Sequence, residues 1–317
     1  FNKSVLFSNL LENDYIFKTI SREKDFYESE LLDWLLVISI DEGSFIDVGA
    51  NIGNHTIFFS KIMERRCYSF EPNETAYKLL KENITINKLE KLVSHFKMAI
   101  GSTNGKASIT NILDNNLGST TISYENNGDI EVKTLDSMIP KSETISLIKI
   151  DVEGFELDVL AGAKEVIQKN SPILLIECMD RMIINKTVEY MKQFQYEPIT
   201  LFGATPMVVF VHKLKIINTF GENVPNFYSE LKSYISEQEK IRNINKRYRE
   251  LSESKDIIKA DLDEARKKYH FSTEQIAEYK IKLLELQNNL KEIENSSKAF
   301  KEEKDDLEKE SEKLQKE

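Results

Sequence analysis

Two residue types that interrupt helices are missing from the C-terminal part of this 317-residue chain, because every glycine and every proline lies at or before Pro225. Cysteine is also scarce. Cys67 and Cys178 are far apart and lie in apolar segments, so we expect buried thiols in a reducing compartment rather than a disulfide framework or a zinc knuckle. No apolar run approaches the roughly 18 residues of a membrane-spanning helix, so we expect no membrane span.

The chain also lacks an excess of positive charge. Its formal net charge is −10 and its sequence pI is about 5.2. An acidic chain is a poor general binder of polyanions, so we expect no nucleic-acid partner. The chain begins with Phe1 rather than methionine, so we expect it to be part of a longer protein. We expect a cytoplasmic location.

The segment beyond Pro225 has the repeat of a coiled coil. Apolar side chains recur at alternating three- and four-residue spacing from Tyr234 to Leu314. Such a repeat keeps one seam of a helix facing a partner. We therefore predict a coiled coil over residues 226–317. Its continuous helix would span roughly 120 Å from Tyr234 to Leu314, pair in cis or in trans, and mediate self-association or partner binding. The alternative is a solvated single helix of balanced charge.

Residues 44–225 alternate strand-like and helix-like segments, after a helical lead-in over residues 1–43. This alternation predicts a Rossmann-like α/β domain with a mainly parallel, doubly covered sheet and an antiparallel edge strand. The predicted strands are Ser44–Val48, Cys67–Phe70, Ser94–Ile100, Ser146–Ile150, Ile173–Cys178, Glu197–Phe202 and Met207–His212. The predicted helices include Thr56–Met63, Thr75–Ile86, Glu156–Gln168 and Thr187–Phe194.

The most informative motif is D-x-G-A-N-x-G, from Asp47 to Gly53. It joins a strand to a helix through a tight turn, as in a nucleotide-binding sheet. Gly49 and Gly53 allow the backbone to turn sharply and to approach a ligand closely. The acid precedes the glycines, unlike the order in a dinucleotide site, and N–H groups of the following helix can receive a carboxylate. A purely structural turn is the alternative.

A second acid, Glu71, ends the next predicted strand, about one βαβ repeat after Asp47. A carboxylate at this place can accept hydrogen bonds from both hydroxyls of a ribose. The alternative is a favourable interaction with the dipole of the following helix.

Lys149, Asp151 and Glu153 alternate at the end of an apolar strand and so share one side of it. Buried charges without partners are costly, so these groups face the ligand, pair with each other or cap the next helix. Asp151 and Glu153 are the best candidates for a general base, with Lys149 beside them. Oxygen ligands from Asp136, Asp151 and Glu153 would suit Mg²⁺, but we expect no metal. For His55 we expect a packing or capping role.

These motifs together resemble the FkbM-type methyltransferase family, over about residues 45–177 and more loosely over residues 26–212. The K-I-D-V-E-G string is the most specific of them, and the predicted coiled coil lies outside the resemblance. In chain order, the motifs are I-D-V-G-A-N-I-G (46–53), F-E-P (70–72), M-A-I-G (98–101), T-L-D-S (134–137), K-I-D-V-E-G (149–154) and P-I-L-L-I-E (172–177).

The resemblance implies a class I, Rossmann-like methyltransferase that uses S-adenosylmethionine. Family members mostly methylate hydroxyls, often on sugars or polyketide products. We therefore expect O-methylation of a sugar, glycan or related small metabolite, in a bacterial enzyme of glycan modification. The resemblance matches the cofactor loop to Asp47, Gly49, Asn51 and Gly53, the ribose acid to Glu71, the adenine-side turn to Lys97, Met98 and Ala99, and the acceptor side to Asp151.

Two other readings compete with this one. A nicotinamide-dependent oxidoreductase would need the G-x-G-x-x-G order, which the loop does not have. A non-catalytic scaffold would combine a methyltransferase-like domain with an assembly-forming coiled coil. Acceptor specificity is expected in two variable segments, Asn111–Asp129 and Phe202–Pro206, of which the first is a lid or an ordinary mobile loop.

Overall fold

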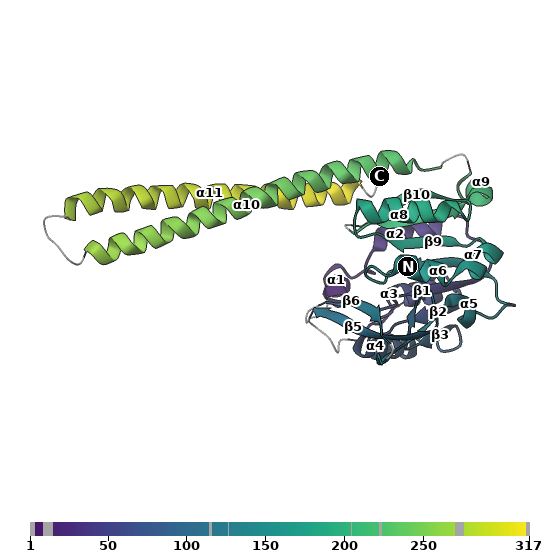
Figure 1. Ribbon diagram of the computed structural model, residues 1–317. Helices are drawn as coiled ribbons and strands as arrows, with labels where there is room; N and C mark the ends of the chain where they lie inside the picture. Colours follow the sequence, from purple (N-terminus) through teal and green to yellow (C-terminus); the bar gives the residue numbers. More distant parts are fainter. Residues whose placement is uncertain are drawn as a thin grey trace. The chain divides into compact units, whose positions relative to one another are not determined.

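The computed structural model describes residues 4–8, 15–113, 116–125, 127–203, 205–221, 224–269 and 276–314. The chain divides into two compact units, Phe1–Phe227 and Tyr228–Glu317 (Figure 1). The first unit holds all the strands found in the described residues, and the second is helical. No helix among the described residues combines the length and apolar character needed to cross a membrane.

A seven-stranded sheet forms the middle layer of the first unit. In spatial order its strands are β10 (Tyr196–Phe202), β11 (Met207–His212), β9 (Ile173–Glu177), β8 (Ile145–Ile150), β1 (Ser44–Val48), β2 (Cys67–Phe70) and β3 (Val93–Phe96). Strands β1, β2, β3, β8 and β9 are parallel, and β11 is antiparallel to both β9 and β10. The predicted mainly parallel sheet with an antiparallel hairpin at one edge is confirmed, and β11 lies just inside the edge strand β10.

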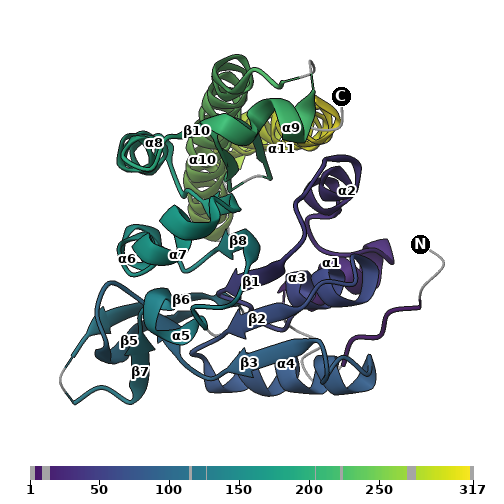
Figure 2. The same cartoon turned by 90° about the vertical axis from the view of Figure 1, so that its right-hand side faces the viewer.

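Helices cover both faces of this sheet (Figure 2). The strands are therefore buried on both sides, and this is why all five residues of β1 are buried. One face carries α2 (Ser29–Val37), α3 (Asn54–Ile57) and α4 (Glu74–Ile86), and α1 (Tyr15–Glu23) precedes them in the chain. The other face carries α5 (Leu135–Met138), α6 (Glu156–Ala161), α7 (Lys164–Asn170) and α8 (Arg181–Lys192). A 3-10 turn, Lys213–Lys215, and α9 (Ile216–Phe220) follow the sheet.

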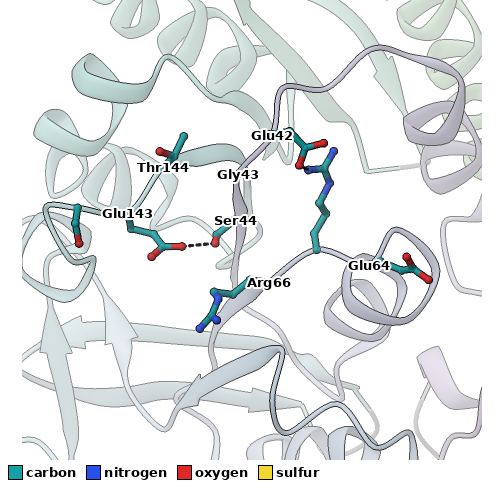
Figure 3. A pocket seen from close by; sticks show the side chains of 9 residues that line it. Glu42, Gly43, Ser44, Glu64, Arg66, Glu143 and Thr144 are labelled. Carbon is teal, nitrogen blue, oxygen red and sulfur yellow. Dashed lines mark hydrogen bonds and ion pairs between the residues drawn. The ribbon is translucent and has the colours of Figure 1, made fainter.

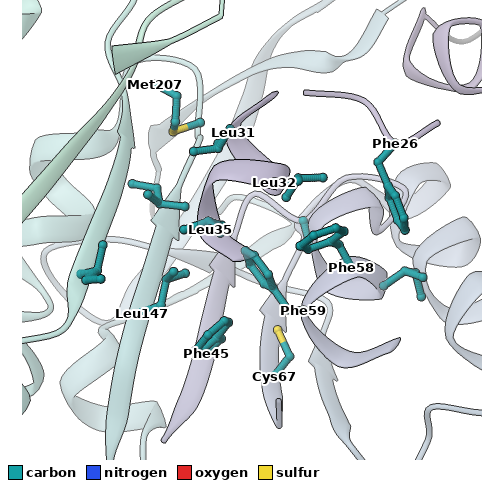
Figure 4. Packing of buried hydrophobic residues seen from close by; sticks show 14 of the residues in the cluster. Phe26, Leu31, Leu32, Leu35, Phe45, Phe58, Phe59, Cys67, Leu147 and Met207 are labelled. Carbon is teal, nitrogen blue, oxygen red and sulfur yellow. The ribbon is translucent and has the colours of Figure 1, made fainter. Parts of the chain in front are cut away.

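The main hydrophobic core lies between the sheet and the first of these helical layers. Leu31, Leu32 and Leu35 of α2 are buried in the same cluster as Phe45 of β1 (Figure 4). The rings of Phe45 and Phe59 meet edge to face with their centroids 5.2 Å apart. Burying one such side chain contributes roughly 1.5–3 kcal/mol, so α2 is held to the sheet by its apolar face.

A second, four-stranded sheet was not predicted. Its strand order is β4 (Ala99–Ile100), β7 (Ile130–Lys133), β5 (Gly105–Leu113) and β6 (Asn116–Tyr124). The predicted single strand Ser94–Ile100 is in fact β3 and β4, in two different sheets. The segment Asn111–Asp129, predicted as a lid or mobile loop, contains the end of β5 and all of β6, which pair antiparallel. Ala204, in the other predicted variable segment, and residues 114, 115 and 126 lie outside the described residues.

Two predicted helices are interrupted. The predicted helix Glu156–Gln168 is the pair α6 and α7, with Gly162 between them. A Cβ on Gly162 would lie 2.0 Å from the carbonyl oxygen of Gly101, so this position packs directly on backbone. The predicted helix Thr56–Met63 is the short α3 followed by a π-helix, Phe58–Ile62. Its wider turn is seen where the Met63 nitrogen donates to the Phe58 carbonyl.

The second unit contains two long helices, α10 (Phe227–Tyr269) and α11 (Ile276–Leu314). The Lys255 amino group lies 3.6 Å from a Glu294 carboxylate oxygen. In one straight helix these residues would be about 58 Å apart, so the chain folds back on itself. The predicted long helical C-terminal segment is therefore confirmed, but it forms two helices and not one continuous helix. Lys255 belongs to the predicted seam, and seam positions from 283 to 307 are less exposed than their neighbours. Seam positions 269–279 and those beyond 310 lie outside the residues whose burial is described.

Candidate functional site

Four acids gather at one edge of the main sheet, where its parallel strands end. Asp47 lies near the end of β1, and Glu71 directly follows β2. Asp151 directly follows β8, and Glu177 is the last residue of β9. Because the carboxyl ends of parallel strands form the ligand-binding edge of an open α/β sheet, this edge is the candidate site.

The loop after β1 has the backbone that its glycines predicted. Gly49 has φ of 77° and Gly53 has φ of 94°, both in the left-handed region. A Cβ on Gly49 would lie 1.7 Å from the carbonyl oxygen of Asp151, so only glycine lets this loop pack against the end of β8. Asn51 also has a positive φ, of 49°, which is uncommon for a residue with a side chain. The loop is therefore tightly specified and lies directly beside the end of β8.

Asp47 lies beneath the loop, with its side chain completely buried. The Thr56 hydroxyl donates a hydrogen bond of 2.6 Å to one of its oxygens, and the Lys149 amino group lies 3.4 Å from the other. The Asp47 carboxylate thus contacts other protein groups. It would act on a ligand indirectly, by holding the side chains of Thr56 and Lys149 in place.

Lys149 connects the loop to the end of β8. Its amino group donates to the Gly49 carbonyl at 2.9 Å and lies 3.0 Å from a carboxylate oxygen of Asp151. Burial by itself lowers the pKa of Lys149, but the negative charges of Asp151 and Asp47 outweigh that effect and raise it. Lys149 therefore stays a cation between two carboxylates, those of the buried Asp47 and the half-buried Asp151, and the three residues form one charge network.

Glu71 lies against the same loop. Its two oxygens accept hydrogen bonds from the backbone nitrogens of Asn51 and Asn73, each at 2.8 Å. Burial raises the pKa of Glu71 to about 7, although these two hydrogen bonds act in the opposite direction. Each carboxylate oxygen can accept more than one hydrogen bond. Glu71 can therefore receive two ligand hydroxyls without giving up its contacts to the backbone.

Carboxyl groups dominate the side of the site formed by β8 and β9. Burial acts to raise the pKa of Asp151, but the charge of Lys149 and other groups holds it below its usual value. Glu153 has φ of 53°, and burial, helped by the charges of Asp151 and Glu156, raises its pKa to about 7. Burial and the charge of Asp151 raise the pKa of Glu177 to about 10.

Glu177 ends the last of the family motifs, P-I-L-L-I-E, and no role was predicted for it. The signal was present in the sequence, because Glu177 ends an apolar strand just as Glu71 and Asp151 follow theirs. An acid at the end of each of several parallel strands marks the edge where ligands bind.

The lead-in segment is joined to the site. The side chain of Asn54 makes two hydrogen bonds with the backbone of Tyr27, at 2.8 and 3.0 Å. His55 is buried, and its Nε2 lies 3.2 Å from a carboxylate oxygen of Glu28. Its ring also lies 5.9 Å from the ring of Phe59. His55 thus packs against the core and brings Glu28 of the lead-in segment close to the loop.

Two further predicted residues lie in other elements. Ala99 belongs to β4, and its side chain is buried in the small core that includes Val132. The Asp136 oxygens accept hydrogen bonds from the nitrogens of Glu165 and Val166, at the start of α7. Asp136 therefore caps a helix and is not gathered with the acids of the site. Within the described ranges, no group of three His, Cys, Asp or Glu residues is placed to hold a metal ion.

A shallow pocket lies at the opposite, amino end of the strands (Figure 3). It is lined by charges of both signs, including Glu42, Arg66 and Glu143. The Ser44 hydroxyl donates to Glu143, and Arg65 pairs with Glu42. Because it lies at the end of the sheet away from the glycine loop, this pocket is not the candidate site.

Comparisons with known proteins agree with the motifs. Residues 47–198 match the family model of the methyltransferase FkbM domain. This match confirms the resemblance that the sequence predicted, and it covers the loop after β1, Glu71, the Lys149–Glu153 segment and Glu177.

Two curated relatives are methyltransferases. The hexuronic acid methyltransferase AglP of Haloferax volcanii is 28% identical over 145 residues, covering 44% of this chain and 58% of AglP. The methyltransferase sdnD of Sordaria araneosa is 26% identical over 155 residues, covering 38% of this chain and 60% of sdnD. The chain thus spans about three fifths of the length of both. The crystal structure of an FkbM methyltransferase from Methylobacillus flagellatus KT is similar with a TM-score of 0.42 and 18% identity, over 54% of this chain and 44% of that chain.

Proposed function

We propose that this protein transfers a methyl group from S-adenosylmethionine to a hydroxyl group of a sugar, glycan or related metabolite. The observation that carries the proposal is the contact between the glycine loop and Glu71, within a segment that matches the methyltransferase FkbM domain. The name of AglP, a hexuronic acid methyltransferase, supports a sugar as the class of acceptor.

The residues at the strand ends fit S-adenosylmethionine. Its ribose hydroxyls and its ammonium group are hydrogen-bond donors, so a fitting site must present acceptors. Glu71 presents two oxygens, and Oδ1 of Asn51 is buried with no hydrogen-bond partner among the described residues. Buried polar atoms rarely stay without a partner, so such an atom suggests that a ligand completes it. We therefore assign Glu71 and Asn51 to the ribose and methionine parts of the cofactor.

The backbone supplies the remainder of the proposed cofactor site. The left-handed turns at Gly49 and Gly53 keep side chains out of the loop surface, so a ligand can approach the backbone. When bound, S-adenosylmethionine supplies an electrophilic methyl group on a positively charged sulfur. Asp47 holds Lys149 and Thr56 beneath the loop and so keeps this surface in place. Ala99 is retained as the adenine-side residue on the family resemblance alone.

Glu153 is the better of the two proposed general bases. A base works best when its pKa lies near the working pH, and burial with neighbouring charges raises the pKa of Glu153 to about 7. Asp151 has a lowered pKa and is held by Lys149, so it stays an ionised acceptor that can orient the hydroxyl. Alignment of the hydroxyl by these carboxylates can supply much of the rate enhancement.

Transfer of isotope-labelled methyl groups to a panel of neutral sugars, uronic acids and oligosaccharides tests the proposal. We expect label on a hydroxyl oxygen, and a loss of about 10²–10⁴-fold in rate for Glu153→Gln. The exposed Glu74→Gln is the matched control and should keep the rate. Absence of transfer by a chain that binds S-adenosylmethionine would favour the scaffold alternative. Label on a carboxylate or a nitrogen would contradict the proposed O-methylation.

We also propose that the α10–α11 pair contacts a second copy of the chain. The helices pair with each other in cis, yet Ile257, Ile281 and Leu284 are 64%, 64% and 60% exposed. Exposed apolar side chains of this size on a helix pair favour association. Light scattering should show a dimer or larger species that Ile281→Lys with Leu284→Lys converts to a monomer. A monomeric mass for the unchanged chain would contradict this proposal.

The cytoplasmic location remains a proposal that rests on the expected reduced thiols, and both Cys67 and Cys178 are free and buried.

A further inference from the structure

Two carboxyl groups are direct neighbours at the candidate site. Strands β8 and β9 pair in parallel with Ile150 opposite Ile176, so the next residues, Asp151 and Glu177, lie side by side. Each carboxyl acts on the pKa of the other, lowering that of Asp151 and raising that of Glu177. Ionised carboxylates can only accept hydrogen bonds, so these two neighbours can bond to each other only when one of them carries a proton.

The surroundings decide which group carries the proton. The amino group of Lys149 lies 3.0 Å from Asp151, and a nearby cation favours the ionised form of a carboxyl. The charges that act most on Glu177 come from Asp151, Glu153 and Glu156, and all of them are negative. Oε2 of Glu177 is also buried and has no hydrogen-bond partner within the described residues. Ionised Glu177 would therefore place negative charge on a buried oxygen beside other anions.

We propose that Glu177 is a positioning residue that keeps its proton at neutral pH and donates it to Asp151, which fixes the Asp151 carboxylate between Glu177 and Lys149. Its role in methyl transfer rests on the proposed function, whereas the shared proton itself does not. Burial and the charge of Asp151, which raise the pKa of Glu177 to about 10, agree with this assignment.

With one proton retained, Asp151 and Glu177 together carry one negative charge on the acceptor side of the site. Two ionised carboxylates would carry two. Asp151 can then present a free lone pair in a fixed direction, because Lys149 and Glu177 hold it from two sides. The charge of Lys149, 3.0 Å away, acts to keep Asp151 ionised. The remaining carboxyls, Glu153 and Glu156, act on Glu177 from the segment after β8 and reinforce its protonated form.

Carbon-13 NMR of the full chain with labelled glutamate carboxyl groups tests this inference without cofactor or acceptor. We expect one glutamate carboxyl to stay protonated at pH 8.5 and to ionise near pH 10. Its signal should be absent from Glu177→Gln and should remain in the exposed-site control Glu74→Gln. In Asp151→Asn, which removes the neighbouring negative charge, the same signal should ionise about 1–3 pH units lower.

Two results would overturn the inference. One is that every glutamate carboxyl is ionised by pH 8.5. The other is that the late-ionising signal survives in Glu177→Gln or does not move in Asp151→Asn. Failure of the wild-type chain to bind S-adenosylmethionine would instead remove the proposed function and leave this titration unchanged, so the two failures are distinguishable.

Discussion

The backbone nitrogen of Asn51 donates a hydrogen bond of 2.8 Å to Oε2 of Glu71. This contact joins the glycine loop after β1 to the acid after β2. It places a carboxylate within the reach of any ligand that the loop holds. The same loop packs on the Asp151 backbone at Gly49, so the cofactor side and the acceptor side of the proposed site meet at one loop.

Cofactor affinity should depend on pH through Glu71. Burial raises the pKa of Glu71 to about 7, and ribose hydroxyls donate best to its ionised form. Affinity for S-adenosylmethionine should therefore increase up to tenfold per pH unit as pH rises toward 7, and then level off. Calorimetry between pH 5.5 and 8.5 measures this. Glu71→Gln cannot ionise and should lack this component, so an identical pH dependence in the variant would contradict the assignment.

A side chain at Gly49 should severely destabilise the fold. The residue has φ of 77°, and a Cβ there would lie 1.7 Å from the Asp151 carbonyl oxygen. Gly49→Ala should cost more than about 4 kcal/mol in urea unfolding. Gly154→Ala is the matched control, since Gly154 has φ of 100° but nothing within 4 Å of its Cβ position. Gly154→Ala should lower the free energy of unfolding only through backbone strain, by about 1–3 kcal/mol. Equal losses would show that the contact with Asp151 is unimportant.

Removing the buried cation should destabilise the protein because it leaves two carboxylates without the cation that they share. Lys149 is 2% exposed and contacts both Asp47 and Asp151. Lys149→Met should lower the free energy of unfolding by about 3–5 kcal/mol. Adding Asp47→Asn should recover part of this loss, since it removes one unbalanced charge. A double-mutant cycle that is additive within about 0.5 kcal/mol would show that the two residues are not coupled.

The two long helices should pair within one chain. The amino group of Lys255 lies 3.6 Å from a carboxylate oxygen of Glu294. Cysteines at both positions should therefore be joined by a short bifunctional maleimide. The native cysteines are buried and should react slowly. We expect the cross-link within single chains at high dilution, as seen by mass spectrometry of the denatured product. Cysteines at Lys255 and Lys298 form a matched control that should join less readily. Cross-links found only between chains would contradict the pairing in cis.

The sequence predicted the main sheet well because its strands are buried on both faces. Ser44–Val48, Cys67–Phe70 and Met207–His212 have the predicted bounds. Such short, mainly apolar strands, bounded by acids and turns, leave little choice of length. Glu71 and Lys149 were found for a related reason, since charges at the ends of apolar strands must face the ligand edge or one another.

The parts that were missed depend on contacts that the local pattern does not contain. Strand β6 is rich in polar and small residues, and it is a strand because its backbone pairs with β5. The return of α11 along α10 preserves the three- and four-residue spacing of the seam, so the pattern alone could not separate one helix from two. The proton shared by Asp151 and Glu177 depends on the pairing of β8 with β9, which lies outside any single motif.

Calorimetric titration of the full chain with S-adenosylmethionine tests the central claim most directly. Glu71→Ala and the exposed Glu74→Ala should be measured alongside at pH 8. We expect micromolar binding by the wild-type chain and by Glu74→Ala, and at least tenfold weaker binding by Glu71→Ala, which corresponds to about 1.4 kcal/mol. No binding by the folded wild-type chain, or equal binding by Glu71→Ala, would contradict a cofactor site at the ends of β1 and β2.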